Sequence, residues 1–134
     1  MLLLDTNIVS YFIYNVDWKE KYIPVVRNKT LFIAFMTLAE MLESARHRGL
    51  SERNFRLFKE RLLTEYTVIP WNEEICDRFA WIRSERRNKP ISVPDALIAA
   101  TALAYDLPLV THNARDFEGI DGLEIITKYQ TPQN

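Results

Sequence analysis

Four acidic side chains, far apart in the sequence, could together do metal-dependent chemistry. They are Asp5, Glu40, Asp95 and Asp116. Carboxylates brought close together raise each other's pKa unless a cation neutralises them. Oxygen ligands with no nearby His or Cys favour Mg²⁺ or Mn²⁺, and one or two such ions suit hydrolysis of a phosphodiester. The acids therefore predict a site for metal-assisted phosphodiester cleavage, provided that the fold brings them together.

The elements that would position these acids alternate between strand and helix. Apolar runs predict buried parallel strands at 2–4, 31–35, 67–69 and 109–111, with a fifth at 123–127. Helical periodicity lies between them, around 8–13, 38–45, 55–62 and 72–87, and the stretch 94–105 is apolar on nearly every side. The pattern predicts one α/β domain over 1–134, in three layers with a central parallel sheet of four to five strands covered by helices on both faces. Residues 128–134 are polar and are expected to fray.

Ligands of open parallel sheets bind beyond the carboxyl ends of the strands. Asp5 follows the first strand directly, Glu40 is expected in the first turn of the helix after the second, and Asp116 follows the fourth by a few residues. Asp95 opens the apolar helix, so the strand-end rule alone does not place it. If that helix starts at the same edge, all four carboxylates share one pocket.

Helix capping is the competing interpretation of three of these acids. Glu40, Asp95 and Asp116 each follow a cap residue by three positions, and the expected caps are Thr37, Ser92 and Asn113. Asp5 has a weaker structural explanation, since Thr6 could cap the helix that follows.

Composition excludes several other classes of protein. Only 3 glycines occur, and neither a GxGxxG nor a GxxxxGK[ST] loop can be written with them, so no nucleotide cofactor is expected. Two histidines and one cysteine cannot build a zinc finger or a disulfide, and no signal peptide or membrane segment is found, which favours the cytoplasm. Removing the four site acids from the total of 18 leaves 14 against 17 bases, so the formal charge of −1 hides a mildly basic remainder.

A basic run precedes the Asp95 segment and could bind RNA phosphates. Its cations are Arg83, Arg86, Arg87 and Lys89, which are also the residue types that favour a helix C-terminus. Trp71 and Trp81 could stack on bases or belong to a core or dimer interface. His112 could contact RNA and is a weaker candidate for a general base, and Cys76 is expected to be a small core residue.

Four segments of the chain resemble the acidic motifs of PIN domains. They are LDTN at 4–7, TLAEML at 37–42, PISVPDALIAA at 90–100 and LVTHNARDF at 109–117. In their order and spacing, from residue 1 to about 126, they resemble more narrowly the VapC toxins of toxin–antitoxin pairs. Asp106 stands where this family often has glycine before the fourth strand, and Ser44 where its helix often has glycine; neither position touches the chemistry.

The resemblance implies an Mg²⁺- or Mn²⁺-dependent endoribonuclease that cuts single-stranded or structured RNA, such as tRNA, and is silenced by a cognate VapB-like antitoxin. It makes Asp5 and Asp95 direct metal ligands, while Glu40 holds the metal or orients its water and Asp116 completes the pocket. Three supporting residues follow from it, namely Thr6, Thr111 and Asn113. A homodimer through helices between residues 17 and 63 is also implied by the resemblance.

Two other functions are compatible with an acidic pocket on an α/β fold. A haloacid-dehalogenase-like phosphatase needs a second acid two positions after the nucleophilic Asp, whereas Asn7 follows Asp5 at that spacing. A receiver-like binding module needs a phosphoacceptor Asp after the middle strand and a Lys after a late strand, and 69–71 and 111–113 supply neither.

Overall fold

The computed structural model describes residues 1–128 and contains all five predicted strands, with ends within two residues of those expected. The strands are β1 (Leu2–Leu4), β2 (Leu31–Ala34), β3 (Thr67–Ile69), β4 (Leu109–Val110) and β5 (Ile125–Ile126). The helices are α1 (Thr6–Tyr14), α2 (Val16–Val26), α3 (Phe35–His47), α4 (Glu52–Glu65), α5 (Glu73–Glu85), α6 (Val93–Ala104) and α7 (Ala114–Phe117). Of the segment expected to fray, 129–134 lies outside the described residues.

The strands form one parallel sheet in the order β3-β2-β1-β4-β5. β1 is central, with Leu3 opposite Phe32 of β2 on one side and opposite Leu109 of β4 on the other. Because all strands run the same way, their carboxyl ends lie along one edge of the sheet, where β1 leads into α1 and β2 leads into α3.

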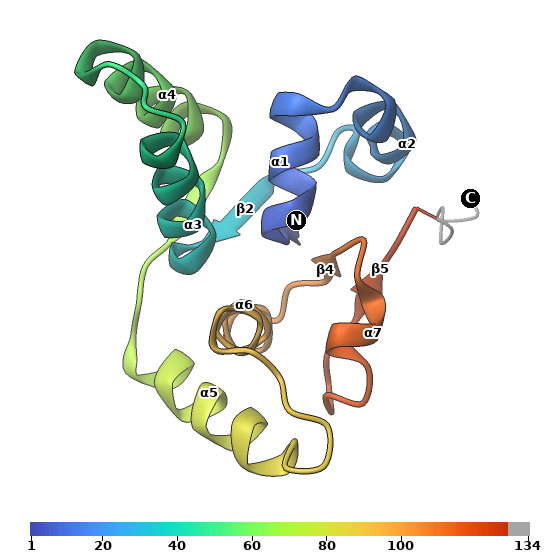
Figure 1. The fold of residues 1–134 in the computed structure, drawn as a ribbon. Helices are drawn as coiled ribbons and strands as arrows, with labels where there is room; N and C mark the ends of the chain where they lie inside the picture. Colours follow the sequence, from blue (N-terminus) through green and yellow to red (C-terminus); the bar gives the residue numbers. More distant parts are fainter. Residues whose placement is uncertain (129–134) are drawn as a thin grey trace.

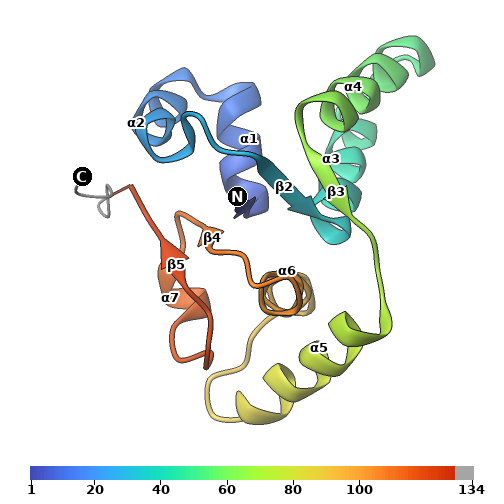
Figure 2. The ribbon, with the colours of Figure 1, turned by 180° about the vertical axis from the view of Figure 1, so that it is seen from behind.

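Alternating side chains of β1 supply two separate cores. Leu3 faces a cluster built with α5, α6 and Phe117 of α7, whereas Leu2 and Leu4 face a cluster built with α1, α2, α3 and α4. Figures 1 and 2 show α5 and α6 on one side of the sheet and α1 and α2 on the other. The predicted three-layer α/β architecture with helices on both faces is therefore confirmed.

Helix α6 has more buried residues than any other described helix, as its uniformly apolar sequence predicted. Its seven residues from Ala96 to Ala102 are all buried, and it packs against both α5 and α3. Ser92 caps its start, because the Ser92 side chain accepts a hydrogen bond from the Asp95 N–H at 3.2 Å. The cap and the packing together hold the first turn of α6, and Asp95 with it, at a defined place.

The backbone conformation of Asp106 explains why an aspartate can stand where the resembled family often has glycine. Its φ of +51° lies in the left-handed region, which glycine enters freely and Asp tolerates better than most residues. The turn between α6 and β4 therefore keeps the geometry that a glycine would give.

No helix among residues 1–128 combines the length and the apolar character needed to cross a membrane.

Candidate active site

The carboxyl edge of the sheet brings the four predicted acids into one electrostatic neighbourhood. Asp5 lies at the end of β1, Glu40 on α3, Asp95 in the first turn of α6 and Asp116 on the short α7. Asp5 is 4% exposed, Glu40 and Asp95 are half-buried, and Asp116 is exposed. The exposure of the four carboxylates therefore increases from Asp5, which is buried at the end of β1, to Asp116, which faces solvent.

Asp5 is held by hydrogen bonds from two directions. Its Oδ1 accepts from the Thr6 N–H at 2.8 Å, and its Oδ2 accepts from the Thr111 hydroxyl at 2.7 Å. The Thr111 oxygen in turn accepts from the N–H of Asn113 at 3.0 Å. The Thr6 hydroxyl donates to Glu40 Oε1 at 2.8 Å, so Thr6 connects the first two acids. The predicted supporting residues thus surround Asp5, although Asn113 does so through its backbone.

The pKa values of three of these acids are raised. Burial is the main reason that the pKa of Asp5 rises from 3.8 to about 6, with the charges of Asp95 and Glu40 adding to the effect. Burial and the charge of Asp95 raise the pKa of Glu40, while burial and the charge of Asp116 raise that of Asp95. The charge of at least one neighbouring acid therefore acts on each of these three carboxylates, and their mutual repulsion destabilises the folded protein when all are ionised.

The capping interpretation holds for only part of this set. The Ser92 side chain caps α6, but Thr37 lies inside α3, which begins at Phe35 after Ala34 without a side-chain cap. The prediction that Glu40 lies in the first turn is wrong by one turn, because the helix starts directly at the strand end.

Asp5, which sequence reasoning treated as having little capping role, is the N-cap of α1. It precedes Thr6 with an extended backbone and accepts the Thr6 N–H. Asn113 makes no side-chain cap at α7.

The donor set fits a hard divalent cation with few protein ligands. Among the described residues, no group of three or more His, Cys, Asp or Glu side chains forms a cage that could hold a metal ion. Mg²⁺ commonly keeps several waters and binds one or two carboxylates together with substrate phosphate, so it does not need such a cage. The mutual repulsion of the acids, of which Asp5 is the most buried, is what a bound cation would relieve.

Removing the hydrogen bond from Thr111 tests what sets the pKa of Asp5. In Thr111→Val, the lost donor removes an interaction that lowers the pKa of Asp5, so this pKa should rise further above 6 in metal-free protein. A ¹³C NMR titration of the Asp5 carboxyl measures it. The matched control is Thr101→Val, because the buried Thr101 hydroxyl donates to the Leu97 carbonyl within α6. A pKa of Asp5 that is equal in the two variants would contradict the assignment.

The basic run before α6 is largely engaged with backbone carbonyls. Arg86 is 9% exposed; its Nε donates to the carbonyl of Lys89 at 2.9 Å, its Nη1 to that of Glu118 at 2.6 Å and its Nη2 to that of Asp116 at 3.2 Å. The guanidinium is thus used inside the protein, and a role of Arg86 in RNA contact stays a prediction.

Two further cations of this run act in the same way. Lys89 donates to the Arg115 carbonyl at 3.0 Å, and Arg83 donates to the Ile91 carbonyl at 2.7 Å. The run thus fastens the segments that carry Asp95 and Asp116, while Arg87 is exposed.

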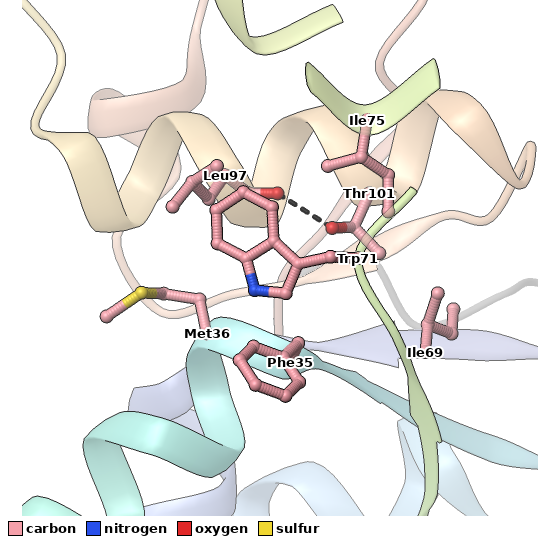
Figure 3. A pocket seen from close by; sticks show the side chains of 7 residues that line it. All are labelled: Phe35, Met36, Ile69, Trp71, Ile75, Leu97 and Thr101. Carbon is pink, nitrogen blue, oxygen red and sulfur yellow. Dashed lines mark hydrogen bonds between the residues drawn. The ribbon is translucent and has the colours of Figure 1, made fainter. Parts of the chain in front are cut away.

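An aromatic corner lies at the ends of β2 and β3. Phe35 and Trp71 meet edge to face, with ring centroids 6.1 Å apart, and both are almost half exposed. Figure 3 shows the Trp71 indole beside Met36 and Leu97, between Phe35 and the helix that holds Thr101. The cavity beneath measures about 10 Å³, which leaves room for little more than a water molecule. The corner is therefore a packed surface and not a ligand pocket.

Cys76 does not lie in the core as expected. It is exposed, because the buried stripe of α5 runs through Ile75 and Ile82. Trp81, on the same helix, is 41% exposed.

Sequence reasoning missed the surroundings of His112. Its Nδ1 lies 3.0 Å from the Tyr22 hydroxyl, and its ring meets the edge of Trp18 at a centroid distance of 4.3 Å. Burial, followed by the charges of Lys128 and Lys21, lowers the pKa of His112. The signal was hidden because Trp18 and Tyr22 belong to α2, a helix that was not predicted.

A parallel sheet with acids along its carboxyl edge defines an α/β protein with an acidic site suited to divalent cations. The chain belongs to the PIN domain family, whose model matches residues 2–123. It is 32% identical over 127 residues to Ribonuclease VapC1 of Haemophilus influenzae strain R2866, covering 91% of this chain and 93% of the relative. It is 28% identical to the tRNA(fMet)-specific endonuclease VapC of Shigella flexneri, covering 90% and 92%.

Solved structures agree with this assignment. The structure of VapBC-1 from nontypeable Haemophilus influenzae matches with a TM-score of 0.79 and 28% identity, covering 96% of this chain and 98% of that one. DNA-bound VapBC from Salmonella typhimurium matches with a TM-score of 0.77 and 25% identity, covering 96% and 99%. The predicted PIN fold and family are thus confirmed.

Proposed function

We propose that this protein is an endoribonuclease toxin that depends on Mg²⁺ or Mn²⁺ and is inhibited by a VapB-like antitoxin. The observation that carries the proposal is that Asp5, Glu40, Asp95 and Asp116 lie near enough to act on one another electrostatically, which together with burial raises the pKa values of the first three. Membership of the PIN family and the ribonuclease names of its relatives support RNA as the substrate.

Asp5 and Asp95 are the proposed metal ligands, with Glu40 and Asp116 completing the pocket. With one or two divalent cations bound, these residues would hold the positive charge that stabilises the transition state and lowers the pKa of a bound water. Thr111 and Thr6 orient the Asp5 carboxylate by the hydrogen bonds they donate to it. Glu40, which accepts a hydrogen bond from the Thr6 hydroxyl, is the residue we propose to orient the water or accept its proton.

The proposed partners follow from the relatives. Matching structures contain VapB and VapC together, which supports a VapB-like antitoxin for this chain. A tRNA(fMet)-specific relative supports a structured RNA such as tRNA as one substrate class. Action in the cytoplasm and a homodimer through the helices between residues 17 and 63 belong to the same proposal.

The two rival functions lack a supporting observation. Asn7, at the position where a haloacid-dehalogenase-like phosphatase needs its second acid, lies in α1 and carries no carboxylate. A receiver-like module would need acidic and lysine side chains that β3 and β4 do not supply at their ends.

Metal removal tests the proposal directly. Purified protein should cut a single-stranded RNA in the presence of Mg²⁺, and EDTA should stop the reaction, because the carboxylates alone cannot offset phosphate charge. Adding Mn²⁺ in excess over EDTA should restore cleavage. Gel separation of end-labelled RNA measures the products, with Asp77→Asn as a control that removes an exposed acid of α5 outside the site. Cleavage that continues unchanged in EDTA would contradict the metal dependence.

A further inference from the structure

A hollow of about 530 Å³ opens beside Asp116 of the acidic cluster. It is lined by Tyr22, His112, Asn113, Ala114, Arg115, Asp116 and Thr127. Pockets that hold small ligands usually measure about 300–1,000 Å³, so this one has the size of a nucleotide site. Its walls come from α2, the start of α7 and the segment after β5.

Two features connect the hollow with the proposed active site. Asp116 lies in its wall and also acts electrostatically on Asp95. Asn113, also in the wall, donates its N–H to Thr111, which donates to Asp5. A strand with its scissile phosphate at the acids would therefore pass directly into this hollow.

The chemistry of the walls suits one nucleotide. Arg115 is exposed, and its guanidinium makes no hydrogen bond or ion pair with the described residues, in contrast to Arg86. His112 offers a flat ring that Tyr22 and Trp18 hold in place. Lys21 lies near this ring and adds positive charge. A guanidinium fits a phosphate, and a fixed aromatic ring fits the face of a base.

We propose that the hollow lined by His112 and Arg115 binds the nucleotide of a single-stranded RNA next to the scissile phosphate, with its phosphate on Arg115 and its base against His112. The proposal rests on the proposed ribonuclease function. It also moves the RNA contact from the run 83–89, where three cations are engaged with carbonyls, to the hollow that Arg115 lines.

Binding measurements test this subsite separately from catalysis. Asp5→Asn protein should bind a fluorescein-labelled single-stranded oligoribonucleotide without cutting it, and fluorescence anisotropy gives the affinity. Adding Arg115→Gln should weaken binding about fivefold at 0.1 M salt and make the dependence of log K on log salt less steep by about 0.7, the change for one phosphate contact on a single strand. Ala114→Phe should weaken binding without changing this slope, because it narrows the hollow and keeps the charge.

The matched control is Arg53→Gln, which removes an exposed arginine from α4, far from α7 in Figure 1. Equal effects of Arg115→Gln and Arg53→Gln would overturn the subsite, because only overall charge would then matter. Unchanged RNA binding together with weaker antitoxin binding in Arg115→Gln would also overturn it and make the hollow a protein interface. Either result leaves cleavage by the unmodified protein intact, so failure of the subsite is distinguishable from failure of the proposed function.

Discussion

Asp5→Asn should lower RNA cleavage by at least about 10³-fold while making the metal-free protein more stable. The loss of activity follows because a metal ion contributes several kcal/mol to transition-state stabilisation, and each 1.36 kcal/mol is a factor of ten. The substitution keeps the helix start intact, because Asn caps helices about as well as Asp and its Oδ1 can accept the Thr6 N–H. A loss of cleavage therefore reports on the carboxylate charge.

The gain in stability follows from the raised pKa of Asp5. The folded protein keeps this proton up to a pH of about 6, whereas the unfolded chain loses it near 3.8. Between these values the folded state binds more protons, so the free energy of unfolding falls as pH rises, by up to about 3 kcal/mol. A neutral Asn at position 5 removes this loss. At pH values above 6 the metal-free Asp5→Asn protein should therefore have a higher Tm than the unmodified protein, whereas at pH 4 the two Tm values should be similar.

Calorimetry at pH 4 and pH 7.5, with and without Mg²⁺, measures both effects. Mg²⁺ should raise the Tm of the unmodified protein, because it binds the folded acids, and should have little effect on Asp5→Asn. Asp77→Asn on α5 is the control, since this exposed acid lies outside the cluster. If Asp5→Asn lowered the metal-free Tm at pH 7.5, Asp5 would serve the fold rather than the metal.

The acidic cluster could be predicted from the sequence because its placement follows from local rules. Asp5 comes directly after a buried strand, and Ser92 marks the start of the helix that carries Asp95. Parallel strands then bring the two segments to one edge. The exact start of α3 could not be predicted in this way, because β2 passes into the helix at Phe35 with no capping side chain at Ala34.

Two features had no readable sequence signal. The buried residues of α2, Tyr22, Val25 and Val26, are confined to its second half, and Pro24 lies among them, so no helical stripe stands out. The burial of Arg86 could not be predicted, because its partners are backbone carbonyls, two of them about 30 residues away, and every residue has such a carbonyl. Long-range contacts of side chain to backbone depend on the fold and leave no pattern of residue types.

Arg86→Met should lower both stability and cleavage, although the Arg86 side chain contacts only backbone carbonyls and none of the proposed site carboxylates. Three carbonyls lose a charged donor, those of Lys89, Asp116 and Glu118. Because water can reach these exposed residues in part, we expect a loss of about 3 kcal/mol in the free energy of unfolding. Cleavage should fall about 10- to 100-fold, as it does when outer partners of metal ligands are removed, because the Asp116 segment loses its anchor.

Arg86→Lys separates this positioning role from RNA binding. Lysine keeps the positive charge but cannot direct three donors to three carbonyls, so a positioning role predicts lower kcat and stability in both variants with KM for RNA almost unchanged. A role in RNA binding predicts instead that Arg86→Lys is close to the unmodified protein and that Arg86→Met raises KM. Arg87→Met is the matched control, because Arg87 is exposed and its loss should change stability by less than about 0.5 kcal/mol. Denaturant unfolding and steady-state cleavage at two salt concentrations distinguish these outcomes, and a KM effect confined to Arg86→Met would refute the anchor.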